Sequence, residues 1–149
     1  MSKTINELEE KEMNNLINNL INKYTSLLAR VLISAIFLMA GASKITAYEG
    51  TQGYMDMMGV PSFLLPLVII TELLGGVAIL IGYKTRIVAL LLAGFSLLSA
   101  LLFHFDFADQ MQSIMFMKNL AIAGGFLLLV NYGAGYFSVD NGLPQGKSQ

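Results

Sequence analysis

Cysteine and tryptophan are absent from this chain of 149 residues, histidine occurs once, and only 13% of the residues are charged. Without cysteine, disulfides, thiol redox chemistry and iron–sulfur clusters are excluded. A single histidine excludes a metal site of the usual histidine-rich kind within one chain. The formal net charge is -1 and the nine basic residues form no run. This argues against nucleic acid as a partner, because phosphate contacts need concentrated Lys and Arg.

Apolar residues, in contrast, make up 55% of the chain, and the mean hydropathy is +0.64. A soluble domain carries about 25% charged residues, roughly twice the share found here. A chain of this length has too much surface to hide so many apolar side chains in a single core. The composition therefore predicts an integral membrane protein whose surroundings are the lipid bilayer.

Four segments are apolar enough to cross the bilayer, for which a helix needs about 20 residues. They are Leu27–Ala42, Phe63–Ile81, Ile87–Phe103 and Lys118–Tyr136. Only residues 82–86 join the second segment to the third, so these two are expected to be antiparallel neighbours. The predicted fold class is all-α, a polytopic bundle of four transmembrane helices.

The basic residues predict the orientation of this bundle. On one side of the predicted membrane lie Lys23, Arg30, Lys84, Arg86 and Lys147. The other side has Lys44 and Lys118 mixed with acidic residues. By the positive-inside rule, both termini and the turn at 82–86 are expected in the cytoplasm.

Residues 4–24 have the pattern of a cytoplasmic amphipathic helix. Thr4 and Glu7 have the spacing of a capping box, and apolar residues then recur at helical spacing up to Tyr24. We therefore expect an N-terminal arm over 1–24, a membrane domain over 25–140 and a flexible C-terminal tail over 141–149. The arm either faces a partner, caps the bundle, or is a solvated extension with no role.

The first loop on the outer side, Ile45–Ser62, is too apolar for a solvated loop and too short and charged to span the membrane. It contains Tyr48, Tyr54 and three methionines. We expect a short interfacial or re-entrant helix that ends at Gly59-Val60-Pro61, or alternatively a simple tyrosine anchor at headgroup depth.

Glu72 lies near the middle of its predicted span, and a charge there costs roughly 2.5–3.5 kcal/mol on insertion scales. It must be protonated or paired with a cation. Matching depths along the helices at about 1.5 Å per residue puts Arg30 and Asn131 within reach of it. The expected Arg30–Glu72–Asn131 cluster is either a structural staple or a ligand or proton site.

A second polar group is expected at the outer ends of the helices. It comprises Lys44, His104, Asp106, Lys118 and Asn119. These residues could form an outward-facing pocket for an anionic or quinone-like headgroup. Alternatively, the two lysines only extend to the interface, as such residues usually do, and His104 is an interfacial side chain.

Several motifs, in order and spacing, resemble the DoxX family of small bacterial inner-membrane proteins. They are Arg30 before Gly41-Ala42-Ser43-Lys44, Gly59-Val60-Pro61, Glu72-Leu73-Leu74-Gly75-Gly76, Leu80–Arg86, Lys118–Gly125 and Gly133–Asp140. The resemblance covers about Thr25 to Asp140 and leaves out the N-terminal arm. It implies a four-helix protein of the bacterial inner membrane.

The family resemblance also implies an association with membrane redox systems, some of them linked to quinones or oxidative stress. We therefore expect an accessory or ligand-binding subunit of such a system, with a quinone as the candidate cofactor and a membrane or cytosolic redox protein as partner. No motif predicts a catalytic activity of its own. The alternatives are a non-catalytic scaffold or assembly factor and, third, an oligomeric small-molecule transporter.

Overall fold

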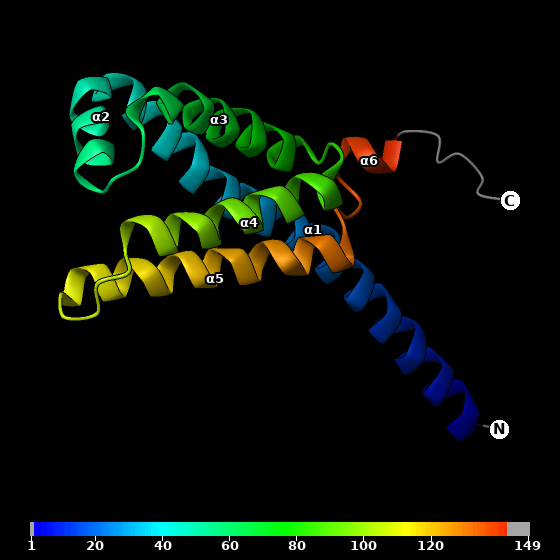
Figure 1. Cartoon of the computed structure of the whole chain (residues 1–149). Helices are drawn as coiled ribbons and strands as arrows, with labels where there is room; N and C mark the ends of the chain where they lie inside the picture. The colour runs from blue at the N-terminus through cyan, green and yellow to red at the C-terminus, as the bar shows by residue number, and fades with distance from the viewer. Residues whose placement is uncertain (1, 143–149) are drawn as a thin grey trace, which may run out of the picture.

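The computed structural model describes residues 2–142, with side chains from residue 9 onward. Its helices are α1 (Ser2–Thr46), α2 (Tyr48–Met57), the 3-10 helix η1 (Ser62–Leu64), α3 (Leu65–Ile81), α4 (Thr85–Phe103), α5 (Gln110–Tyr132) and α6 (Val139–Gly142). No strand occurs among these residues (Figure 1). Four stretches are long and apolar enough to cross a membrane: residues 9–46, 62–81, 85–103 and 110–132. The predicted all-α fold with four spanning helices is confirmed.

The four long helices form two packed pairs, α1 with α3 and α4 with α5 (Figure 1). Small residues allow the first pair to approach closely: a Cβ on Gly41 would lie 2.8 Å from the Leu73 side chain. In lipid, such close packing is what holds helices together. The two pairs meet at a core that includes Phe37 of α1 and Phe126 of α5, whose rings pack edge to face with centroids 5.2 Å apart.

Large apolar side chains cover much of the outer surface of the bundle. On each of the four long helices, at least one leucine is more than half exposed, including Leu32, Leu74, Leu91 and Leu128. A soluble protein of this size rarely leaves so large an apolar surface uncovered. The distribution is that of a protein whose outward face meets hydrocarbon.

The arm and the first span are one continuous helix, α1, rather than two separate elements. Thr4 lies within this helix rather than before it, and the predicted capping contact of Thr4 with Glu7 concerns side chains outside the described residues. The predicted end at Ala42 was also too early, because α1 continues to Thr46. Of the predicted C-terminal tail, Asn141 and Gly142 are helical in α6, and 143–149 lie outside the described residues.

The fourth span begins at Gln110, so the predicted start at Lys118 was wrong. The reason is a local helix cap: the carboxylate of Asp109 accepts hydrogen bonds from the backbone N–H of Met111 and of Gln112. Such a cap satisfies donors that have no partner within the helix. The helix ends at Tyr132 because Gly133 follows with a φ of 77°.

A short helix does occupy the loop between the first two spans, as predicted. It is α2, which is followed by Gly59 with a φ of 72° and by Pro61. Its Met55 is buried against Leu65 and Ile69 near the start of α3. This contact folds α2 back over the end of the bundle, and its interfacial or re-entrant placement in the membrane stays a prediction.

Candidate functional site

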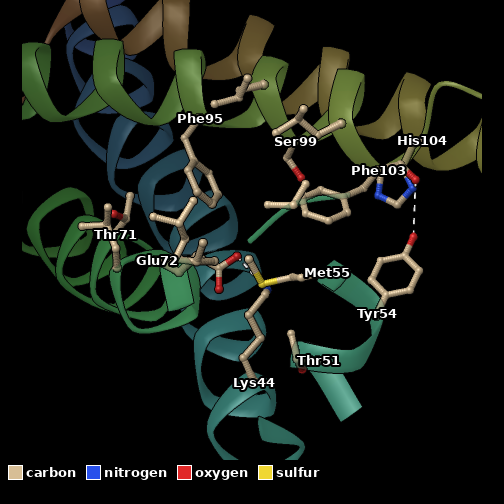
Figure 2. A pocket seen from close by; sticks show the side chains of 16 residues that line it. Lys44, Thr51, Tyr54, Met55, Thr71, Glu72, Phe95, Ser99, Phe103 and His104 are labelled. Carbon is tan, nitrogen blue, oxygen red and sulfur yellow. Dashed lines mark hydrogen bonds and ion pairs between the residues drawn. The ribbon is translucent and has the colours of Figure 1, made fainter. Parts of the chain in front are cut away.

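A cavity of about 380 Å³ opens where α2 meets the gap between α3 and α4 (Figure 2). Its wall is mainly apolar, with Phe95 and Phe103 of α4 and Met55 of α2 among the larger side chains. The polar side chains on the wall are Lys44, Thr51, Tyr54, Thr71, Glu72, Ser99 and His104. An apolar cavity with a few convergent polar groups is the usual form of a small-molecule site.

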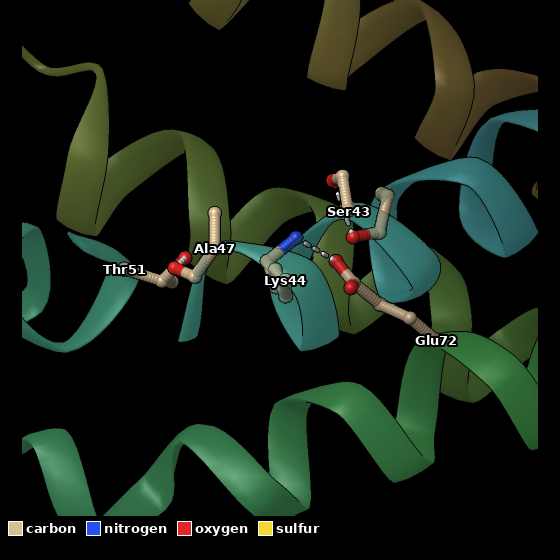
Figure 3. Close-up of polar contacts among 6 residues, drawn as sticks. Ser43, Lys44, Ala47, Thr51 and Glu72 are labelled. Carbon is tan, nitrogen blue, oxygen red and sulfur yellow. Dashed lines mark hydrogen bonds and ion pairs between the residues drawn. The ribbon is translucent and has the colours of Figure 1, made fainter. Parts of the chain in front are cut away.

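Lys44 and Glu72 form an ion pair on the wall of this cavity, with Nζ 2.8 Å from Oε1 (Figure 3). Lys44 lies in the last turn of α1, where a cation interacts favourably with the helix dipole. Glu72 is only 5% exposed, and its Oε2 has no hydrogen-bond partner in the described part of the chain. A buried carboxylate oxygen that accepts no hydrogen bond costs free energy, and a ligand that donates one would remove that cost.

Gly41 explains how Lys44 reaches Glu72. It lies one helical turn before Lys44, and a Cβ at Gly41 would lie 3.4 Å from the Cβ of Glu72 and closer still to Leu73. The glycine therefore lets α3 approach α1 at the level of the ion pair. The Gly-x-x-Lys spacing noted in the sequence has this packing as its structural basis.

His104 and Tyr54 lie at the other end of the cavity, near the end of α4 (Figure 2). The Nδ1 of His104 lies 2.7 Å from Oε1 of Gln112 on α5, within hydrogen-bond distance. Tyr54 stacks on Phe103 and its hydroxyl donates to the Phe103 carbonyl at 3.3 Å, which ties α2 to α4.

The predicted Arg30–Glu72–Asn131 cluster is wrong. Arg30 is fully buried at the opposite end of the bundle, where it donates to the Leu80 carbonyl at 2.8 Å and to the carbonyls of Ile79 and Phe137. Asn131 is exposed on α5. The depth estimate failed because α1 packs on α3 with Gly41 against Leu73, which puts Lys44 rather than Arg30 at the level of Glu72.

The DoxX family model matches residues 25–105. The chain belongs to the DoxX family. It is 58% identical over 114 residues to Inner membrane protein YqjF of Escherichia coli, covering 76% of this chain and 88% of that relative. Inner membrane protein YphA of the same organism is 34% identical over 121 residues, covering 76% and 86%. A Bacillus subtilis protein named "Putative oxidoreductase CatD" is 41% identical over 68 residues, covering 46% and 51%.

No solved structure matches the chain. Its inner-membrane relatives and its four spanning helices identify it as a DoxX-family inner membrane protein. The family match includes α1 from residue 25 onward and all of α2, α3 and α4. All residues that line the cavity therefore fall within the family region.

The remaining predicted site residues of this DoxX protein do not reach the cavity. Lys118 is exposed on α5, with Nζ 3.8 Å from the Met115 sulfur, and Asn119 donates to the Met115 carbonyl within the same helix. Of the seven candidates, the structure brings together Lys44, Glu72 and His104. Sequence reasoning missed Thr71 and Ser99, whose only signal is a hydroxyl in a predicted span, and Thr51, which lies in the predicted first loop.

Proposed function

We propose that this DoxX protein is a ligand-binding accessory subunit of a membrane redox system, and that its cavity holds the head group of a quinone. The observation that carries the proposal is the Lys44–Glu72 pair, whose free carboxylate oxygen is buried on the wall of an apolar cavity. The second carboxylate oxygen of this buried pair is free to accept a hydrogen bond from a ligand. A ligand with both a hydrogen-bond donor and an acceptor would complete the site.

The apolar part of the wall supports a ligand that comes from the bilayer. Leu67 of α3 and Leu98 of α4 both line the cavity and are 61% and 55% exposed. They lie on the outer surface that meets lipid. The cavity thus adjoins the hydrocarbon between α3 and α4, and a lipophilic molecule could enter there without crossing water.

The polar part of the wall supports a ring that carries oxygen atoms. Lys44 has donors left beyond the one used on Glu72, and Glu72 has a free acceptor. A quinone offers carbonyl acceptors and its reduced form offers hydroxyl donors, so this pair of residues could bind either form. Phe95 and Phe103 provide aromatic surface for the quinone ring. They lie on the cavity wall together with the Lys44–Glu72 pair and His104.

An accessory role, rather than electron transfer by the chain itself, is supported by the residue inventory. The chain has no cysteine and a single histidine, so it offers few ligands for an iron–sulfur cluster or a haem. Electrons would then pass between the bound quinone and a partner protein. The oxidoreductase name of CatD, a relative over less than half of this chain, agrees with that setting.

The direct test is quinone binding to the purified protein in detergent. We expect short-chain ubiquinone or menaquinone analogues to raise the thermal unfolding temperature, since a ligand at about 100 times its Kd stabilises by about 2.7 kcal/mol. Glu72→Gln and Lys44→Gln should weaken binding about tenfold, because each removes a charged hydrogen-bonding group. Lys118→Gln, an exposed cation outside the cavity, is the matched control. No stabilisation by any quinone, or equal affinity in all variants, would reject the proposal.

One observation favours a scaffold role as the second candidate. The arm part of α1 carries an exposed apolar face that nothing in the described structure covers, formed by Met13, Leu16, Ile17, Leu20, Ile21 and Tyr24. At the base of the arm, Nζ of Lys23 lies 3.8 Å from the centre of the Tyr136 ring. If the arm recruits a partner, a chain without residues 2–22 should still bind quinone. It should fail to complement a strain that lacks the protein.

A further inference from the structure

A second cavity, of about 640 Å³, lies at the end of the bundle opposite the quinone pocket. It is an open cavity lined by the start of α4, the end of α5 and the segment that leads to α6. Lys84 and Arg86 supply its basic side chains, and Gly133 and Gly135 form part of its backbone wall. This cavity shares no residue with the quinone pocket.

The two basic side chains in this second cavity have no hydrogen bond or ion pair within the described residues. The Arg86 guanidinium lies against Gly133, where a Cβ would be 3.5 Å from Nε. Nζ of Lys84 lies 5.7 Å from the centre of the Tyr83 ring. Both residues are exposed, so their donors are available to an anion.

Asp140, the acidic residue on the same wall, does not cancel this charge. Its two carboxylate oxygens accept the backbone N–H of Lys84 at 2.7 Å and of Thr85 at 2.8 Å. The buried cation Arg30 lies nearby and attracts the same carboxylate. Lys84 and Arg86 outnumber this one carboxylate, so the lining of the cavity keeps a net positive charge.

The backbone at Lys84 is an independent sign that this position is special. Lys84 has a φ of 45°, the one positive φ of a residue other than glycine between residues 2 and 142. Glycine or asparagine adopts this left-handed conformation at lower cost. Lys84 lines the cavity in this conformation, and such backbone strain is found more often at functional sites.

The surroundings of the cavity indicate a lipid rather than a soluble anion. Ile87 and Tyr132 line the cavity and are 62% and 77% exposed, and Leu91 and Leu128 continue this apolar surface along α4 and α5. A head group in the cavity would leave its acyl chains lying on these side chains. Basic pockets between spanning helices bind anionic lipid head groups in this manner.

We propose that Lys84 and Arg86 form a binding site for the phosphate group of an anionic phospholipid. Arg86 offers a planar guanidinium that can donate two parallel hydrogen bonds to phosphate oxygens, and Lys84 adds a point charge. The site holds the lipid at the junction of α4, α5 and the C-terminal segment. It depends neither on the quinone pocket nor on the proposed redox role.

The test is native mass spectrometry of the full chain in dodecyl maltoside, titrated with phosphatidylglycerol and with phosphatidylcholine of the same acyl chains. We expect one tightly bound phosphatidylglycerol and weaker binding of phosphatidylcholine, whose choline offsets the phosphate charge. Arg86→Gln should weaken phosphatidylglycerol binding about tenfold, and adding Lys84→Gln should weaken it further. Lys118→Gln, at the other end of the bundle, should leave the affinity unchanged.

Three results would overturn the proposal. Phosphatidylglycerol affinity could be the same in Arg86→Gln as in the parent, or it could fall equally in Lys118→Gln, which would mean diffuse attraction. Alternatively, inorganic phosphate at millimolar concentration could displace the lipid, which would point to a soluble phosphate as the occupant. Arg86→Gln removes no hydrogen bond within the described residues, so it decides the question even if Lys84→Gln disturbs the fold.

Discussion

Arg30 and Asp140 hold the turn between α3 and α4 from its two sides. The guanidinium of Arg30 donates to the Leu80 carbonyl near the end of α3, and the carboxylate of Asp140 accepts the N–H groups of Lys84 and Thr85 at the start of α4. A cation thus lies at a helix C-terminus and an anion at a helix N-terminus, which is the favourable arrangement for both helix dipoles. This turn joins the two helix pairs. Arg30 connects α1 to the turn, and Asp140 connects the C-terminal segment to it.

Replacing Arg30 should strongly destabilise the fold. In Arg30→Met, the carbonyls of Ile79, Leu80 and Phe137 lose their donor in a buried place, and we expect a loss of about 3 kcal/mol in the free energy of unfolding. Arg30→Lys should recover only part of it, because one ammonium cannot match the geometry of the guanidinium. Unfolding in mixed micelles of dodecyl maltoside and sodium dodecyl sulfate measures the difference. Full stability of Arg30→Met would contradict the structure.

Asp140 should make stability depend on pH in the acid range. Burial alone would raise the pKa of this carboxyl, but the hydrogen bonds from Thr85 and Lys84 and the charge of Arg30 bring it below its ordinary value. As the pH falls, the unfolded chain therefore binds the proton first. The stabilisation is complete above the ordinary pKa of 3.8 and is lost as the pH falls through the lower native value.

The measurement is the free energy of unfolding of the parent and of Asp140→Asn from about pH 7 to about pH 3. The difference between the two proteins should be constant near neutral pH and shrink below about pH 4. Other carboxylates titrate in both proteins and cancel in the difference. A difference that grows on acidification would contradict the lowered pKa.

Gly82 should not tolerate a side chain. Its φ is 72°, and a Cβ there would lie 2.6 Å from Nη1 of Arg30 and 3.1 Å from the Cβ of Ala134. Gly82→Ala should therefore cost about 3 kcal/mol from backbone strain and steric overlap together. The control is Gly94→Ala on α4, where a Cβ would meet nothing within 4 Å, and its stability should stay within about 0.5 kcal/mol of the parent. Equal stability of the two variants in the same unfolding assay would refute this packing.

The spanning helices were predictable because their signal is local. A run of apolar residues identifies a span whatever its neighbours are, and the ends marked by Gly82 and Phe103 agreed with the structure. The start of α5 was not found, since residues 110–117 mix polar and apolar side chains and only the cap at Asp109 reveals the helix. Local polarity was thus a poor guide where a cap extends a helix beyond its most apolar part.

The partner of Glu72 could not be predicted, because it depends on how helices shift along one another. The sequence identified the buried carboxylate and required that it be either protonated or paired with a cation. Arg30 and Lys44 are about 21 Å apart along a helix, and only the packing of Gly41 against Leu73 shows which of the two lies level with Glu72. Arg30 itself uses backbone carbonyls as partners, and nothing in a sequence pattern points to carbonyl acceptors.

The orientation of the chain is a further prediction. The turn at 82–84 and the C-terminal segment lie at one end of the bundle, and by the positive-inside rule this end faces the cytoplasm. A green fluorescent protein fused after Gln149 should then fluoresce, and alkaline phosphatase fused there should be inactive. Alkaline phosphatase inserted after Asp106, in the loop at the other end, should be active. The reverse pattern would refute the assigned orientation.

The Lys44–Glu72 pair should show an asymmetric double-mutant cycle. Glu72 is almost fully buried within α3, whereas Lys44 lies near the end of α1 on a long flexible side chain. In Glu72→Leu the lysine can extend towards the membrane surface, so we expect a loss of only about 1 kcal/mol. In Lys44→Met the buried carboxylate has no partner, so the expected loss is about 3 kcal/mol.

The double variant Lys44→Met with Glu72→Leu should recover most of the stability lost in Lys44→Met, because it leaves no buried charge. The matched control is Lys118→Met, an exposed lysine without an ion pair, which should change the free energy of unfolding by less than about 0.5 kcal/mol. Additive losses in the double variant would mean that the two side chains do not interact. A double variant that is stable yet no longer binds quinone would instead separate the role of the pair in stability from its role in binding. In that variant the apolar side chains restore the packing, but the free carboxylate oxygen and the ammonium donors are gone.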